Sequence, residues 1–393
     1  MKAMVLVAGK GTRVRPITND IPKPMVPILG KPVMESILQL LHKHGIDDVM
    51  INTSFLSSVI EDYFQDGGLL DMEIGYSYEG QLEDGKLVGM ALGSAGGMRK
   101  IQDFSGFFDE TFIVLCGDAW IDLDVQSVLD FHRKKGGIAT IVLQQVEWQE
   151  VSKYGVVELD AQQRILQFQE KPDQEEAISN MINTGIYIFE PEIFDYIPAL
   201  QEFDIGSELF PALIANNVPF YGKKIDFQWV DIGSIPDVLV ATKMALRGEI
   251  KGFKLPGKEI APSIRTGINV KLNLDDISIS GPVYIGSGTE IEKGVILEGP
   301  LMIGANCKIE SGAHLKECLV DKYTRVSGLA KLDNKILFGK YCIDGGGEHL
   351  DVEDTDLSWL IDDSRSVPST ERTDIISSYQ ELLSEYLPAS ESD

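Results

Sequence analysis

The sequence has few of the features that mark secreted, membrane-bound or nucleic-acid-binding proteins. Four of its 393 residues are cysteine, and their spacing matches neither a disulfide framework nor a metal site, which fits a reducing compartment. No apolar stretch approaches the roughly 20 residues that cross a bilayer, and the one near the start is too short for a signal peptide. Lysine and arginine total 35 against 61 acidic residues, a formal net charge of −26. The sequence therefore predicts a cytoplasmic protein that binds neither nucleic acid nor membranes.

Basic residues are scarce, but five of them gather near the beginning of the chain. They are Lys10, Arg13, Arg15, Lys23 and Lys31. A local positive site indicates a small anionic ligand, and the pocket itself must hold that ligand because the net charge of the protein opposes it.

Three of these cations lie in a glycine-rich loop, Val7–Pro16 (VAGKGTRVRP), that follows an apolar run. It is not a Walker A loop, because its lysine precedes the second glycine, and it lacks the third glycine of a dinucleotide fingerprint. Gly9 and Gly11 permit a sharp turn and a close approach of the backbone to a ligand. Exposed N–H groups beside Lys10 and Arg13 would form an anion cradle. The alternative is an ordinary strand-to-loop turn with solvated basic side chains.

Residues 1–250 alternate strand-like and helix-like patterns, which predicts a mostly parallel sheet covered by helices. The expected strands are 3–7, 48–52, 73–78, 111–116, 138–144, 185–189 and 219–224. The expected helices include 32–44, 56–64, 125–135 and 235–246. Ligands of such folds bind at the carboxyl ends of the strands. The glycine loop and Asp118 each follow a strand, so we expect them at one edge of the sheet.

The sequence changes character after a connector at residues 251–275. Between residues 276 and 345, aliphatic residues recur every six positions, at Ile279, Ile285, Ile291, Leu297, Ile303, Ile309 and Leu315. A six-residue repeat with a superposed 18-residue period is typical of a hexapeptide parallel β-helix with triangular coils. After Leu315 the register slips by one residue, so we expect the last coils to be irregular.

The final segment, residues 346–393, is an acidic tail. Its apolar residues fall on one face of a predicted helix, namely Ile375, Ile376, Tyr379, Leu382, Leu383 and Tyr386. The polar face carries few cations, so we expect the helix to dock on protein rather than on a membrane. We expect a homo-oligomer assembled through the β-helix or this tail.

The order of the motifs resembles that of the sugar-1-phosphate nucleotidyltransferases, also called nucleotide-sugar pyrophosphorylases. The motifs are VLVAGKGTRVRPIT…PKPMVPILGKP at the start, then LGSAGGM (92–98), LCGD (115–118), YGVV (154–157), EKP (170–172), NTGIYIF (183–189) and WVDIG (229–233). Within the family, the sequence most resembles the cyanobacterial group of UDP-glucose pyrophosphorylases and mannose-1-phosphate guanylyltransferases. The resemblance implies an α/β, Rossmann-like nucleotidyltransferase (GT-A-like) domain over residues 1–250, followed by a left-handed β-helix.

The resemblance also implies a reaction and a set of residues. An oxygen of a sugar-1-phosphate attacks the α-phosphorus of a nucleoside triphosphate in line and expels pyrophosphate. The implied ligands of Mg²⁺ are Asp118 and Asp231. The implied catalytic residues are Arg13, Lys23 and Asp118. The implied nucleotide-binding residues are Gly9, Lys10, Gly11, Thr12, Arg13, Gly93 and Ser94. The implied sugar-phosphate-binding residues are Tyr154, Gly155, Glu170, Lys171, Asn183 and Thr184.

The motifs leave the base and the sugar open. Overall likeness to the cyanobacterial group favours UTP with glucose-1-phosphate, and GTP with mannose-1-phosphate is the alternative. The segment Glu79–Gly89 departs from the shorter form usual in bacterial relatives. It precedes the base-contacting motif, where it could cover the nucleotide.

Two other functions share parts of this pattern. An acyltransferase built on the β-helix would need a catalytic histidine, but His314, the only histidine in the repeats, neighbours inward-facing Leu315 and should point outward. A non-catalytic regulatory relative should have lost part of its active site. All five of its charged residues are present, namely Arg13, Lys23, Asp118, Lys171 and Asp231.

Overall fold

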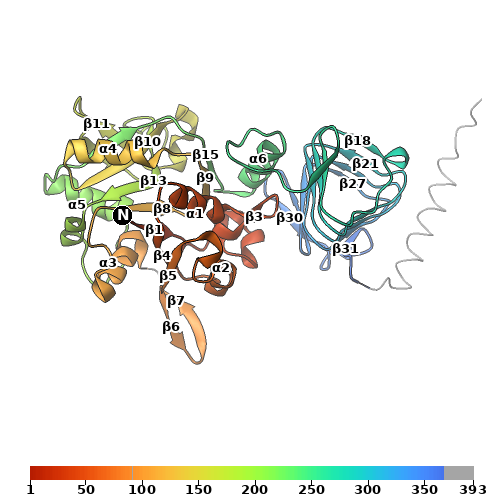
Figure 1. Ribbon diagram of the computed structural model, residues 1–393, viewed down its shortest axis with the longest axis horizontal. Coiled ribbons are helices and arrows are strands. Elements are labelled where there is room, and N and C mark those ends of the chain that lie inside the picture. The colour runs from red at the N-terminus through yellow and green to blue at the C-terminus, as the bar shows by residue number, and fades with distance from the viewer. Residues whose placement is uncertain (91, 367–393) are drawn as a thin grey trace, which may run out of the picture. The chain divides into compact units, whose positions relative to one another are not determined.

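The computed structural model describes residues 1–90 and 92–366. These residues form two compact units (Figure 1). The first unit comprises residues 1–27 and 31–233, and the second comprises residues 28–30 and, among the described residues, 234–366. The tail helix predicted from the sequence lies outside the described residues.

A nine-stranded mixed sheet forms the centre of the first unit. Its strands are β1 (Lys2–Leu6), β4 (Asp48–Thr53), β5 (Glu73–Tyr78), β8 (Phe112–Cys116), β10 (Ala139–Gln145), β11 (Val156–Leu159), β12 (Ile165–Gln169), β13 (Met181–Phe189) and β14 (Tyr221–Lys224). The order is β12-β11-β13-β8-β1-β4-β5, and β10 pairs with both β13 and β14.

The prediction of a mostly parallel sheet is right for one half of this sheet and wrong for the other. Strands β8, β1, β4 and β5 are parallel neighbours. Strand β13 runs antiparallel to both β8 and β10. The reason is topological, because β8 and β10 are joined across a helix and run in the same direction, and β13 returns from the β11–β12 hairpin to insert between them.

Helices cover both faces of this sheet. They are α1 (Val33–Lys43), α2 (Ser57–Phe64), α3 (Gly93–Ser105), α4 (Val125–Lys135) and α5 (Phe210–Ala215). Alternate residues of β1 point to opposite faces. Ala3 and Val5 pack with side chains of α1, α2 and α4, whereas Met4 packs with side chains of α3 and α5. The sequence did not predict α3, because its glycine-rich start lowers helix propensity.

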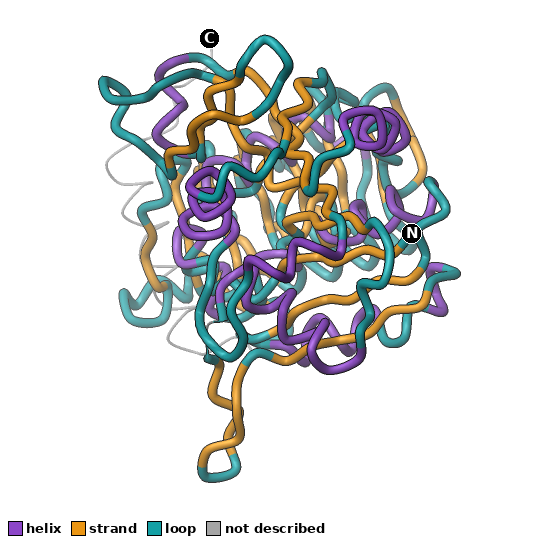
Figure 2. The backbone as a smooth tube through the Cα atoms, turned by 90° about the vertical axis from the view of Figure 1, so that its left-hand side faces the viewer, coloured by secondary structure: helices purple, strands orange, loops and turns teal. Residues whose placement is uncertain are grey.

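The long segment after Glu79 forms an antiparallel hairpin of β6 (Gly80–Glu83) and β7 (Lys86–Gly89). The hairpin projects from the body of the first unit (Figure 2).

The second unit begins with α6 (Ile235–Leu246) and continues into three sheets of short strands. One sheet contains β16 (Lys258–Ala261), β17 (Ile264–Thr266), β19 (Val283–Ile285), β22 (Leu301–Ile303), β25 (Leu319–Val320), β28 (Lys335–Phe338), β29 (Tyr341–Asp344) and β30 (His349–Asp351). Another contains β18 (Ser278–Ser280), β21 (Ile296–Glu298), β24 (His314–Lys316) and β27 (Lys331–Asp333). The third contains β20 (Glu290–Ile291), β23 (Lys308–Ile309), β26 (Thr324–Val326) and β31 (Ile361–Asp363).

The register of these strands follows the sequence repeat. Ile285 lies beside Ile303, and Leu297 beside Leu315, each pair 18 positions apart in parallel strands. Beyond Leu315 the spacing falls by one residue, since Ile303 lies beside Val320. This arrangement is consistent with the predicted β-helix. It also extends into the predicted connector, where β17 pairs in parallel with β19.

Among residues 1–90 and 92–366, no helix is both long enough and apolar enough to cross a bilayer.

Adjacent residues of β21 test the packing of the repeats. Leu297 is fully buried, whereas Ile296 is 38% exposed. We predict that Leu297→Ala lowers the free energy of unfolding by about 2–5 kcal/mol, because it leaves a cavity in a packed interior. The matched variant Ile296→Ala should cost less than about 1 kcal/mol. Urea denaturation followed by circular dichroism measures both, and equal losses would contradict the inward orientation of Leu297.

Candidate active site

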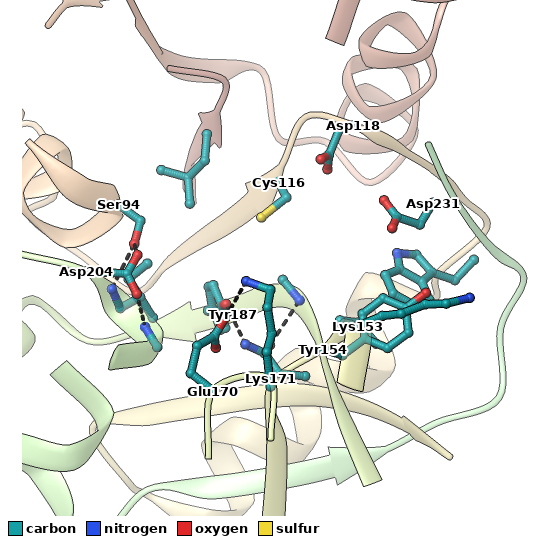
Figure 3. Close-up of a pocket in the computed structure, with 18 of the residues that line it drawn as sticks. Ser94, Cys116, Asp118, Lys153, Tyr154, Glu170, Lys171, Tyr187, Asp204 and Asp231 are labelled. Carbon is teal, nitrogen blue, oxygen red and sulfur yellow. Dashed lines mark hydrogen bonds and ion pairs between the residues drawn. The ribbon is translucent and has the colours of Figure 1, made fainter. Parts of the chain in front are cut away.

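A cavity opens in the first unit at the carboxyl ends of β1 and β8 (Figure 3). Leu6 ends β1, Cys116 ends β8, and both line the cavity. The two strands are parallel neighbours, so the loops that follow them emerge at the same edge of the sheet. Arg13 from the first loop and Asp118 from the second both line this cavity. The sequence prediction that these loops meet is confirmed.

Two aspartates lie side by side on one wall of the cavity. The antiparallel pair β9 (Ala119–Ile121) and β15 (Trp229–Asp231) sets Asp231 opposite Ala119. The N–H of Ile232 donates to the carbonyl of Asp118 at 3.0 Å. Backbone pairing therefore holds the two residues together, and their carboxylates face the same space (Figure 3).

Lys23 lies against this pair of acids. Its Nζ forms an ion pair with Oδ2 of Asp118, and its side chain is 13% exposed. Burial lowers the pKa of Lys23, but the charges of Asp118 and Asp231 outweigh burial, so the pKa lies above its ordinary value of 10.5. The stabilisation from this raised pKa is complete below pH 10.5 and is lost only as the pH rises through the higher folded value. Lys23 is therefore an ammonium at neutral pH.

The glycine loop brings Lys23 close by allowing tight backbone packing. Gly11 has φ of +60°, and a Cβ at this position would lie 2.8 Å from Cβ of Lys23. The hydroxyl of Thr18 donates to the carbonyl of Gly11 at 2.8 Å. Only glycine fits this left-handed, crowded position without displacing Lys23.

The opposite wall carries a second ion pair. Nζ of Lys171 lies 2.6 Å from Oε1 of Glu170. The backbone of Lys171 is left-handed, with φ of +44°, although the residue precedes a proline, which disfavours compact conformations. Its N–H donates to the carbonyl of Tyr154 at 3.2 Å. Such strain concentrates at functional positions.

Two predicted sugar-site residues use their side chains within the protein. The amide of Asn183 donates to the Tyr187 hydroxyl at 2.9 Å, and its carbonyl accepts from the N–H of Gly185 at 3.0 Å. The hydroxyl of Thr184 donates to the carbonyl of Val142 at 2.8 Å. These side chains shape the wall of the cavity.

The cavity collects most of the residues predicted from the sequence. Those that line it are Arg13, Lys23, Ser94, Asp118, Tyr154, Gly155, Glu170, Lys171, Asn183, Thr184 and Asp231. Those that do not line it are Gly9, Lys10, Gly11, Thr12 and Gly93.

Sequence reasoning missed four polar or aromatic residues of the lining, Lys153, Tyr187, Asp204 and Trp229. Lys153 directly precedes the YGVV motif, and a cation at that place was a usable signal. The Trp229 and Tyr154 rings lie 5.2 Å apart. Asp204 lies outside the motifs identified in the sequence, and only the tertiary fold brings it to the cavity.

The chemistry of the acid pair fits a hard divalent cation. Asp118 and Asp231 offer only oxygen atoms, and within residues 1–90 and 92–366 no cluster of three or more His, Cys, Asp or Glu is placed to hold a metal. Mg²⁺ commonly takes one or two carboxylates and completes its shell with phosphate oxygens and water. An acid pair next to Arg13 and Lys23 therefore suits a metal-bound polyphosphate.

A family model described as nucleotidyl transferase matches residues 2–248. The chain belongs to the nucleotidyl transferase family. The family resemblance in the ordered motifs is thus confirmed.

Named relatives of this nucleotidyl transferase span most of its length. A UTP–glucose-1-phosphate uridylyltransferase of Synechocystis sp. is 55% identical over 93% of this chain and 94% of its own. A mannose-1-phosphate guanylyltransferase of Mycobacterium tuberculosis is 32% identical over 75% of this chain and 78% of its own.

A solved structure confirms the Rossmann-like nucleotidyltransferase fold. It is the crystal structure of a UDP-glucose pyrophosphorylase complexed with UDP-glucose. The likeness has a TM-score of 0.52 and 25% sequence identity, and covers 63% of this chain and 98% of that chain.

The ion pair of Lys23 can be tested without a substrate. We predict that Asp118→Asn lowers the pKa of Lys23, because Asp118 is the acid that raises it most. The Lys23 amine should then react faster with acetic anhydride at pH 9, as measured by competitive labelling and mass spectrometry. The control Asp226→Asn removes the same charge from an exposed residue outside the cavity. Equal Lys23 labelling rates in the two variants would contradict the pairing.

Proposed function

We propose that the protein makes UDP-glucose and pyrophosphate from UTP and glucose-1-phosphate. The observation that carries this proposal is the 55% identity, over 93% of the chain, to the uridylyltransferase of Synechocystis sp.. The cavity supports it, because one wall gathers Asp118, Asp231 and Lys23 and the opposite wall carries Lys171.

The nucleotide is proposed to bind on the side of the glycine loop. The backbone of Gly9, Lys10, Gly11 and Thr12 would hold the phosphates, and Gly93 and Ser94 would border the nucleoside. Asp118 and Asp231 would hold Mg²⁺, which when bound supplies positive charge to the α-phosphate. Arg13 and Lys23 would stabilise the charge that develops on the departing pyrophosphate.

The sugar phosphate is proposed to bind against the Glu170–Lys171 pair. Nζ of Lys171 would bind the phosphate and orient its oxygen for in-line attack on the α-phosphorus. As that bond forms, the bond from the α-phosphorus to the bridging oxygen of pyrophosphate breaks. The carboxylate of Glu170 would accept hydrogen bonds from sugar hydroxyls, and Tyr154, Gly155, Asn183 and Thr184 would form the pocket wall.

A second candidate is the use of GTP and mannose-1-phosphate. The observation in its favour is the 32% identity to the guanylyltransferase of Mycobacterium tuberculosis. That likeness is lower and covers less of the chain, so we place this reaction second.

We propose the following domain organisation. Residues 1–250 would form the catalytic domain, and residues 251–275 would form the connector. Residues 276–345 would form a left-handed β-helix of hexapeptide repeats, followed by the acidic tail at 346–393. The β-helix or the tail would mediate a cytoplasmic homo-oligomer that needs neither nucleic acid nor membrane.

Pyrophosphate release tests the reaction directly. The purified protein with Mg²⁺ is assayed with UTP, GTP, dTTP, ATP and CTP, each with glucose-1-phosphate and mannose-1-phosphate. We predict the highest kcat/KM for UTP with glucose-1-phosphate. A preference for GTP with mannose-1-phosphate would establish the second candidate instead, and no release with any pair would refute both.

A substitution of Lys171 should affect the two proposed substrates differently. We predict that Lys171→Ala raises the KM for glucose-1-phosphate about 10- to 100-fold, because a hydrogen bond to a charged group is lost. The KM for UTP should rise far less than the KM for glucose-1-phosphate. Lys134→Ala, which removes an exposed lysine of α4, serves as the charge-matched control and should resemble the unmodified protein. Equal changes in both KM values would move Lys171 out of the sugar-phosphate site.

A further inference from the structure

Backbone hydrogen bonds join the start of α3, which is proposed to bind the nucleotide, to the distant residue Phe203. The N–H of Phe203 donates to the carbonyl of Leu92 at 2.9 Å, and the N–H of Ala95 donates to the carbonyl of Phe203 at 3.0 Å. Gly93 has φ of +70°, and a Cβ there would lie 2.5 Å from the carbonyl oxygen of Phe203. The start of α3 and Phe203 are therefore held together by backbone hydrogen bonds and close packing.

Side chains continue this connection at the cavity. The hydroxyl of Ser94 donates to Oδ2 of Asp204 at 2.7 Å and accepts from the N–H of Ile205 at 2.8 Å (Figure 3). The other oxygen of Asp204 accepts from the N–H of Gly206 at 2.9 Å and from the N–H of Ser207 at 3.0 Å. One carboxylate thus joins the start of α3 to the first turn of the π-helix Ile205–Leu209.

Asp204 is suited to this task as an ionised carboxylate. Burial raises its pKa, but hydrogen bonds from Ser207 and Ser94 outweigh burial, and the pKa lies below its ordinary value. An ionised carboxylate accepts hydrogen bonds at both oxygens, which the bonds to Ser94 and to the π-helix require.

The far end of this network lies against the proposed sugar-phosphate site. A Cβ at Gly206 would lie 2.9 Å from Oε2 of Glu170. The other carboxylate oxygen of Glu170 is paired with Lys171. A shift of Gly206 would therefore press on the acid that positions Lys171. The hydrogen-bonded path runs from Ser94 through Asp204 to Gly206, and Gly206 lies directly beside Glu170.

We propose that Asp204 is a positioning residue that couples the nucleotide-binding and sugar-phosphate-binding sides of the cavity, acting through Ser94 and Gly206. Ordering of the α3 start by a nucleotide would fix the backbone of Gly206, and Glu170 would then hold Lys171 ready for the sugar phosphate. Each substrate would tighten the binding of the other by the same factor, as thermodynamic linkage requires. This inference rests on the proposed function of the site.

Calorimetry on the full chain with Mg²⁺ measures this coupling without turnover. The probes are α,β-methylene-UTP, which cannot release pyrophosphate, and glucose-1-phosphate. The Kd of the nucleotide analogue is determined alone and with saturating glucose-1-phosphate. For the unmodified protein we predict that the sugar phosphate tightens the analogue at least about fivefold.

Four variants locate the coupling. Asp204→Ala and Ser94→Ala each remove one partner of the Ser94–Asp204 hydrogen bond. The coupling factor, which is the Kd of the analogue alone divided by its Kd with glucose-1-phosphate, should then fall to about one. Asp204→Asn keeps an oxygen for the N–H groups of Gly206 and Ser207, so it should fold normally and regain part of the coupling. Ser207→Ala is the matched control, because it removes a hydroxyl that donates to Asp204 at 3.0 Å without touching Ser94, and it should keep the full factor.

The outcomes separate this inference from the proposed function. If both probes bind to the unmodified protein but show no coupling, or if Asp204→Ala and Ser94→Ala keep the original factor, the positioning role is refuted and the proposed function stands. If neither probe binds to the unmodified protein, the proposed function fails and this inference fails with it.

Discussion

Two neighbouring carboxylates repel each other, and the active cavity depends on how that repulsion is offset. Backbone pairing of β9 with β15 holds Asp118 and Asp231 side by side. The ammonium of Lys23 lies against them and is held in its charged form by both acids. The metal ion of a metal-bound polyphosphate would bring positive charge to the same acids. Binding would then release Lys23 from Asp118 and make its charge available to the phosphates.

The rest of the first unit places this charged cluster opposite a second one. Parallel strands β1 and β8 deliver the glycine loop and Asp118 to one edge of the sheet, and Gly11 leaves the space that Lys23 needs. Antiparallel β13 inserts beside β8 and carries Asn183 to the other wall, near the Glu170–Lys171 pair. Asp204 joins Ser94, at the start of α3, to Gly206, which lies beside Glu170. The antiparallel half of the sheet thus gives the cavity its second wall.

The sequence predicted those parts of the structure that leave a local or periodic pattern in the sequence. The six-residue repeat predicted the inward positions of the second unit, because each side of a triangular coil buries one aliphatic residue. The glycine loop and Asp118 could be placed at one edge, since parallel strands end together. The direction of β13 could not be foreseen, because strand order depends on pairing between distant segments. Asp204 was missed for the same reason: its partners Ser94 and Gly206 reveal its role only once the chain has folded.

A crystal structure of the protein with UDP-glucose and Mn²⁺ tests most directly whether the acid pair is the metal site. Anomalous scattering locates Mn²⁺ independently of any assumed geometry. We expect the anomalous peak between the carboxylates of Asp118 and Asp231, with Nζ of Lys23 moved from Asp118 toward the phosphates. A peak elsewhere, with Lys23 still paired to Asp118 in the presence of UDP-glucose, would contradict the account.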